Sequence, residues 1–272
     1  MRSIHPTAQI DPSAQLGEGV EIGPYCVIGA DVVLGAHVSL ASHVVLEGPM
    51  EIGEGVLIRA FAALGGPPQI KPYTSPAETR LEIGPGCDIR EHVTMNRGSR
   101  QGLGVTRIGR DCLFMAQAHV GHDCQVGERV VLAQGATLGG HAIIGDAVTL
   151  GGLSAVHQRS RIGRLAMIGG LVGVYGDIIP FGLSGGERAC LSGLNRVGMR
   201  RSGMSGELVR LLGGMYSELF HGEGQFADRL DKLAKQYEQV SEAMEIVHFL
   251  RAPRQRPLVP ARRSWQTGPG LE

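Results

Sequence analysis

The chain has 272 residues, enough for one elongated domain or two compact ones with a buried core. Its 26 basic and 26 acidic residues give a formal charge of zero, which excludes a strong overall field toward nucleic acid or a membrane surface. The 42 glycines and the aromatic content of only 4% exclude an ordinary globular composition.

The cysteines argue against a cross-linked or metal-stabilised domain. The five are scattered and form no CxxC pair, so they predict neither a disulfide framework nor a structural zinc site. We expect them to be reduced, in a cytoplasmic protein. No run of 18 apolar residues occurs, so no stable membrane insertion is expected, and nothing in the sequence indicates a cofactor.

An aliphatic residue returns every six positions along most of the chain. The repeat runs from Ile10 to Leu64, resumes over residues 83–95, and continues without interruption from Ile108 to Val174. A period of six suits short strands joined by tight turns, with one large side chain per strand pointing inward. Three such hexads would form one triangular coil, and successive coils would stack about 4.8 Å apart. The sequence therefore predicts a mainly β protein built as a parallel β-helix.

The interruptions of the repeat divide the chain into three parts. Pro- and Gly-rich insertions are typical of loops, and apolar residues three and four apart are typical of helices. The predicted parts are a β-helix over residues 1–180 with loop insertions at about 65–82 and 97–107, a connecting segment and small α-helical domain over 181–250, and a flexible basic tail over 251–272.

Four histidines fall into one five-residue window of three successive coils. They are His119, His122, His141 and His157, and they should form a band on one side of the β-helix. The band would extend over two coil spacings, or about 10 Å. Gly140 should lie between His122 and Gln158, which are 36 residues apart, and leave room there for a substrate atom.

A band of imidazoles has three interpretations. A histidine that titrates near neutrality is the usual general base for activating a hydroxyl. Asp123 could orient His122, although adjacent strand residues point to opposite faces, so that this partnership requires a turn or a neighbour across an interface. The histidines could instead be solvated surface groups, or they could bind zinc from separate coils or subunits.

Several motifs together resemble one family closely. The segments "HPTAQIDPSAQLGEGVEIGPYCVIG", "NRGSRQGLGVTRIG", "AHVGHDC", "ATLGGH", "SAVHQ" and "GLNRVGMRRSG" are similar to the UDP-N-acetylglucosamine O-acyltransferases of lipid A biosynthesis, over about residues 4–250. The resemblance implies a left-handed parallel β-helix followed by a small C-terminal α-helical domain. It also implies a homotrimer with active sites between subunits. The implied reaction transfers a (3-hydroxy)acyl chain from acyl carrier protein to the 3-hydroxyl of the UDP-amino sugar.

The resemblance also implies roles for individual residues. By position, His122 would be the general base with Asp123 beside it, and the backbone N–H of Gly140 would stabilise the oxyanion. No metal is implied. Positions that match contacts to the substrates are Gln69, Lys71, His119, His141, His157 and Gln158 around the sugar and acyl groups, Asn195 and Arg201 at the uracil and phosphates, and Gly170 and Met115 where acyl length is measured.

The chain departs from the family pattern at a few positions. The first loop reads Gln69-Ile70-Lys71-Pro72-Tyr73 and lacks the usual aspartate, and Arg159 replaces an aromatic residue. These departures keep open a related acyltransferase whose acceptor is another nucleotide sugar, such as one with a 3-amino group. A metal-dependent β-helix enzyme and a non-catalytic binding solenoid are the alternatives from other classes.

Overall fold

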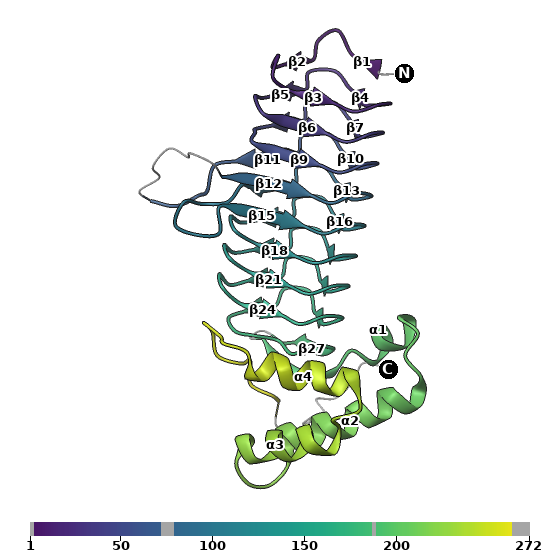
Figure 1. Ribbon diagram of the computed structural model, residues 1–272, viewed down its shortest axis with the longest axis vertical. Coiled ribbons are helices and arrows are strands. Elements are labelled where there is room, and N and C mark those ends of the chain that lie inside the picture. The colour runs from purple at the N-terminus through teal and green to yellow at the C-terminus, as the bar shows by residue number, and fades with distance from the viewer. Residues whose placement is uncertain (1–2, 72–78, 187–188, 263–272) are drawn as a thin grey trace.

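The protein is a column of stacked triangular coils with a group of helices at its C-terminal end (Figure 1). The computed structural model describes residues 3–71, 79–186 and 189–262. The fold is a left-handed parallel β-helix followed by a small helical part, which confirms the predicted fold class. None of the described helices combines the length and apolar character that crossing a bilayer requires.

The described strands form three sheets, one for each face of the column. The first face consists of β1 (Ser3–Ile4), β4 (Glu21–Ile22), β7 (Ser39–Leu40), β10 (Leu57–Ile58), β13 (Asp88–Ile89), β16 (Leu113–Phe114), β19 (Val131–Leu132), β22 (Thr149–Leu150), β25 (Met167–Ile168), β27 (Gly182–Gly185) and β28 (Cys190–Leu194). The second consists of β2 (Gln9–Ile10), β5 (Val27–Ile28), β8 (Val45–Leu46), β11 (Ala63–Gly66), β14 (Thr94–Asn96), β17 (His119–Val120), β20 (Thr137–Leu138), β23 (Ala155–Val156) and β26 (Gly173–Val174). The third consists of β3 (Gln15–Leu16), β6 (Val32–Leu34), β9 (Met50–Ile52), β12 (Arg80–Ile83), β15 (Val105–Ile108), β18 (Gln125–Val126), β21 (Ile143–Ile144) and β24 (Arg161–Ile162).

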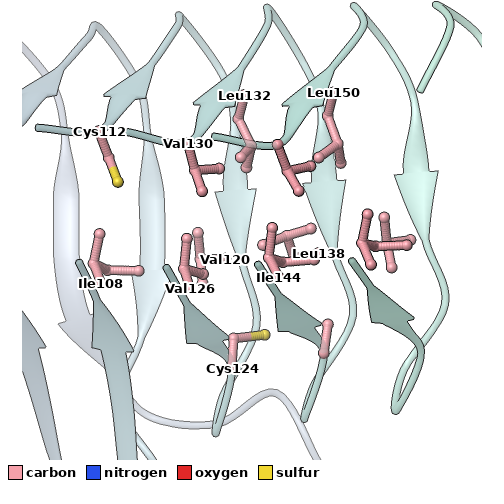
Figure 2. Close-up of a cluster of buried hydrophobic side chains, with 14 of the residues drawn as sticks. Ile108, Cys112, Val120, Cys124, Val126, Val130, Leu132, Leu138, Ile144 and Leu150 are labelled. Carbon is pink, nitrogen blue, oxygen red and sulfur yellow. The ribbon is translucent and has the colours of Figure 1, made fainter. Parts of the chain in front are cut away.

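The register between coils follows the hexad repeat. Thr137 pairs with His119 on one side and with Ala155 on the other, so that residues 18 apart lie one above the other. Except for β28, which pairs antiparallel with β27, the paired strands run parallel. The aliphatic residues point into the column and stack in rows, as Figure 2 shows for the coils around Val120 and Leu138. This single continuous core explains why one large residue per strand suffices.

Each coil turns sharply at positions with a left-handed backbone. Many residues three positions after an inward aliphatic have positive φ, among them Asp123 (φ 60°), His141 (φ 61°) and Arg159 (φ 66°). Aspartate and histidine tolerate this conformation better than bulkier residues do. At the corner that holds these three residues, the turns therefore display polar side chains in a vertical column, 18 residues apart.

Within the described part of the chain, four helices close the C-terminal end of the column (Figure 1). They are α1 (Arg196–Arg201), α2 (Gly206–His221), α3 (Phe226–Gln236) and α4 (Ser241–Arg251). The Ser205 side chain caps α2 by accepting a hydrogen bond from the Leu208 N–H. Helix α4 packs on the last coils, where Arg164 pairs with Glu245 at 2.7 Å and the guanidinium of Arg161 lies over the ring of Phe249.

The segment after α4 corrects the prediction of a flexible tail. Residues 252–262 return to the β-helix, where the Asp177 N–H donates to Pro257 O and the Leu191 N–H donates to Pro260 O. The Val259 side chain is buried. We name residues 253–262 the C-terminal strap. The sequence does not predict the strap, because pairing through isolated bridges requires no periodic pattern. Residues 263–272 lie outside the described residues.

Candidate active site

The four histidines of the predicted band lie on consecutive coils at one edge of the column. We call the turns that follow β17, β20 and β23, with residues 121–124, 139–142 and 157–160, the histidine corner. His122 and His141 touch edge to face, with ring centroids 4.9 Å apart. His119 lies on β17 just before this corner, and His157 lies in the third turn, with its ring 5.6 Å from that of Tyr175. The structure thus places all four histidines at or beside one corner, with the rings of His122 and His141 in contact.

His122 and Asp123 form a hydrogen-bonded pair. His122 Nδ1 lies 2.7 Å from Asp123 Oδ2, although the two residues are adjacent in the chain. The left-handed backbone at Asp123 allows this, because a turn, unlike a strand, can direct successive side chains to one side. The turn that the sequence analysis requires for a His122–Asp123 partnership is therefore present.

The Asp123 carboxylate is held by a loop that sequence reasoning did not connect with it. Ser99 donates to Asp123 from its N–H at 3.0 Å and from its hydroxyl at 2.6 Å, and the Gly104 N–H donates at 3.1 Å. The side chain of Asp123 is completely buried. Residues 99–104 thus fold over the histidine corner. No spacing in the sequence indicates this contact, because the loop lies outside the hexad repeat.

The environment of Asp123 decides the tautomer of His122. Burial alone would raise the pKa of Asp123, but the hydrogen bonds from His122 and Ser99 outweigh it and lower the pKa to about 2. The ionised carboxylate can only accept, so Nδ1 of a neutral His122 must donate. The lone pair of His122 is therefore on Nε2, the nitrogen that faces away from Asp123.

Gly140 lies directly against the free nitrogen of His122. A Cβ atom added to Gly140 would come within 2.6 Å of His122 Nε2, so the glycine keeps this side of the ring open. Among the described residues, no group accepts a hydrogen bond from the Gly140 N–H. The corner thus places a base nitrogen and an unpaired backbone donor next to each other.

The other three histidines have distinct surroundings. His119 Nδ1 lies 2.8 Å from the Thr94 hydroxyl, and burial lowers the pKa of His119. Burial also lowers the pKa of His141, against the opposing effect of Asp123. His157 Nδ1 lies 3.2 Å from Gln158 O, and the Gln158 side chain is exposed.

The same corner contains a set of side chains of the kind that bind metal ions. Potential ligand atoms of His122, Asp123 and His141 all lie within 4.8 Å of one another. Both Asp123 oxygens, however, already accept hydrogen bonds from Ser99, and Oδ2 also accepts one from His122. An ion bound there would have to break these bonds. The geometry is that of an oriented imidazole rather than of an open coordination site.

The remaining predicted site residues lie elsewhere in the chain. Met115 and Gly170 are exposed in the turns after β16 and β25, at a different corner of the triangle. Asn195 caps α1, accepting from Gly198 N–H at 2.9 Å and donating to Leu165 O at 2.9 Å, and Arg201 is exposed at the end of that helix. These four residues are not brought to the histidine corner within one chain.

The first loop is described only in part. Gln69 and Lys71 are exposed in the segment that follows β11. Pro72 and Tyr73 lie outside the described residues. The prediction that the altered loop permits another acceptor therefore rests on the sequence alone.

The fold and the histidine corner define a class of protein, the hexapeptide-repeat transferases. The chain matches the bacterial transferase hexapeptide repeat over residues 3–36, 13–48 and 106–140. It also matches domain 2 of UDP-N-acetylglucosamine O-acyltransferase over residues 177–259.

Individual relatives cover most of the chain. The acyl-[acyl-carrier-protein]–UDP-N-acetylglucosamine O-acyltransferase of Caulobacter vibrioides is 52% identical over 79% of this chain and 81% of its own. The Rhizobium rhizogenes protein of the same name is 41% identical over 79% of each chain. The structure of LpxA from Acinetobacter baumannii superposes with a TM-score of 0.90 at 37% identity and covers 94% of this chain and 99% of its own. The chain belongs to the UDP-N-acetylglucosamine O-acyltransferase family.

Proposed function

We propose that this acyltransferase moves a (3-hydroxy)acyl chain from acyl carrier protein to the 3-hydroxyl of UDP-N-acetylglucosamine, the first step of lipid A biosynthesis. The observation that carries the proposal is the His122 imidazole in a member of this family, oriented by Asp123 with Nε2 beside Gly140. A thioester is already activated toward acyl transfer, so a base and an oxyanion donor suffice for the chemistry.

The steps follow from the geometry of this corner. Nε2 of His122 takes the proton of the sugar hydroxyl as its oxygen attacks the thioester carbonyl. The charge that develops on the carbonyl oxygen is stabilised by the Gly140 N–H, which has no other partner among the described residues. The intermediate then breaks its carbon–sulfur bond, and the imidazolium returns the proton to the leaving thiolate. Asp123 stabilises the imidazolium throughout.

The complete site is proposed to form between protomers of a homotrimer. Gly170, Met115, Asn195 and Arg201 would then contact the substrate from a neighbouring protomer, because they lie away from the histidine corner of their own chain. Exposed apolar side chains support such contacts: Ile143 is 49% exposed, Leu153 64% and Leu171 74%.

The remaining parts of the proposal concern the partners and the location. Gln69, Lys71, His119, His141, His157 and Gln158 are proposed to contact the sugar and acyl groups. The acyl donor is acyl carrier protein, and the reaction is placed in the cytoplasm, in keeping with five cysteines that form no disulfide.

Product analysis tests the proposal. Purified protein is incubated with a panel of carrier-bound acyl thioesters and UDP-N-acetylglucosamine, and the products are identified by mass spectrometry. We expect a singly acylated UDP-sugar, and at least about a hundredfold less of it with His122→Ala. A parallel incubation with a 3-amino UDP-sugar tests the alternative acceptor that the altered first loop kept open. Transfer to the amine alone, or no transfer to any UDP-sugar, would overturn the proposed acceptor.

A further inference from the structure

A groove lined by both polar and apolar side chains lies beside the histidine corner, between the loop that covers Asp123 and the C-terminal strap. It has a volume of about 330 Å³. Residues from three parts of the chain line it, including Gln101, His141, Arg159, Arg161 and Gln255. Arginine and amide side chains that converge on one concave surface are typical of sites for polar, charged ligands.

Arg159 stands at the centre of this arrangement. It lies 18 residues after His141 and 36 after Asp123, so that these three residues occupy successive turns of one corner. The backbone of Arg159 is left-handed, with φ 66°, and the residue is exposed. Its Nη1 donates to Gln255 Oε1 at 2.9 Å, which ties the guanidinium to the strap.

Two arginines line the groove, and of these only Arg159 has no carboxylate partner among the described residues. Arg161 is paired with the buried Asp177 at 2.7 Å, and the other buried carboxylate, Asp123, is occupied by Ser99, Gly104 and His122. Within the described residues, no carboxylate lies within 4 Å of the Arg159 guanidinium. Arg256 adds a second positive charge next to the groove, where its Nε donates to Gln158 O at 3.0 Å.

We propose that Arg159 binds the diphosphate of the nucleotide sugar. This inference rests on the proposed function and adds a phosphate contact on the catalytic corner itself, separate from Arg201 on α1. A planar guanidinium with several donors suits phosphate oxygens, and the Gln255 contact holds it in place.

The spacing of the coils favours the sugar diphosphate over the phosphate of the acyl donor. Arg159 lies two turns from Asp123, a distance of about 10 Å along the column. In a UDP-sugar, only the sugar ring separates the 3-hydroxyl from the diphosphate. In a carrier-bound thioester, the whole pantetheine arm separates the thioester from its phosphate. A hydroxyl at His122 therefore places the sugar diphosphate within reach of Arg159.

Equilibrium binding measures this contact without acyl transfer. UDP and uridine are titrated by calorimetry into the wild-type protein, Arg159→Gln and Arg129→Gln. Arg129 is the matched control because it is also an exposed arginine with a left-handed backbone, φ 53°, at another corner. We expect Arg159→Gln to lower the affinity for UDP on the order of tenfold and to leave the affinity for uridine unchanged. Arg129→Gln should change neither.

Other outcomes would overturn the assignment. Unchanged UDP affinity in Arg159→Gln, or an equal loss for UDP and uridine, contradicts a phosphate contact. A loss confined to coenzyme A, titrated as a probe of the pantetheine phosphate, would assign Arg159 to the acyl donor instead. Arg159→Lys keeps the charge and should retain part of the UDP affinity, which guards against a folding defect in the glutamine variant. If the wild-type protein transfers acyl chains and Arg159→Gln binds UDP with wild-type affinity, this inference is refuted and the proposed function stands. A wild-type protein that binds no UDP-sugar would refute the proposed function as well.

Discussion

Nδ1 of His122 lies 2.7 Å from a carboxylate oxygen of Asp123, whose side chain has no exposed surface. The two neighbours in sequence meet because the chain turns between them, and a loop about 20 residues earlier covers the carboxylate. Orientation of a base by a buried acceptor is the arrangement on which the proposed chemistry depends.

Removal of the imidazole should lower turnover sharply and leave the fold intact. His122→Ala is expected to lower kcat by a factor on the order of 10² to 10⁴, the usual contribution of a general base. The His122 side chain lies outside the hydrophobic core of the column, so circular dichroism and oligomeric state should match the wild type. His92→Ala, which removes an exposed histidine from another corner, is the control. Activity within tenfold of wild type would show that His122 is not the base.

A single methyl group at Gly140 should act on the same nitrogen. The added Cβ of Gly140→Ala would lie 2.6 Å from His122 Nε2 and would displace the ring or the bound hydroxyl. We expect kcat to fall at least tenfold while thermal stability changes little. Gly214→Ala on α2, where an added Cβ meets nothing within 4 Å, should leave kcat unchanged. Equal kinetics for the two variants would contradict the open space assigned to Gly140.

The buried carboxylate should make folding sensitive to acid. The pKa of Asp123 in the folded protein is about 2, below the value of about 3.9 in an unfolded chain. Its ionised form therefore stabilises the fold by about 2 kcal/mol above pH 4, and this contribution is lost as the pH falls toward 2.

Denaturant unfolding between pH 2 and pH 5 measures this contribution. Asp123→Asn should be less stable at pH 5 and should show a shallower dependence of unfolding free energy on pH. Asp31→Asn, at an exposed turn with φ 57°, is the matched control and should keep the wild-type slope. The same slope in Asp123→Asn as in the wild type would argue against the ionised, hydrogen-bonded carboxylate.

The arginine at the end of α1 should affect binding more than chemistry. Arg201 is exposed and lies outside the histidine corner of its own chain, so a role in the reaction would be through contact with a bound nucleotide across protomers. We expect Arg201→Ala to raise KM for the UDP-sugar on the order of tenfold and to change kcat little. Steady-state kinetics at saturating acyl donor separate the two effects. An unchanged KM with reduced kcat would contradict this role.

The spacing of residues in the sequence predicts most of the fold and which histidines lie at the site. A period of six determines both the triangular coil and the register of 18, because each inward aliphatic must meet the next one above it. From that register alone, His119, His122, His141 and His157 could be placed on one side of the column. The resemblance supplied the left hand of the β-helix, which periodicity cannot provide.

The sequence by itself thus determined which residues stack along the column, since stacking in a repeat depends only on counting. Tertiary structure alone decided what lies across the column: the loop around Ser99 that encloses Asp123, and the C-terminal strap that reaches Gln158 and Arg159. Both segments lie outside the repeat and are held by isolated hydrogen bonds and buried side chains. Such contacts form between segments that are distant in the sequence, so no periodic pattern predicts them.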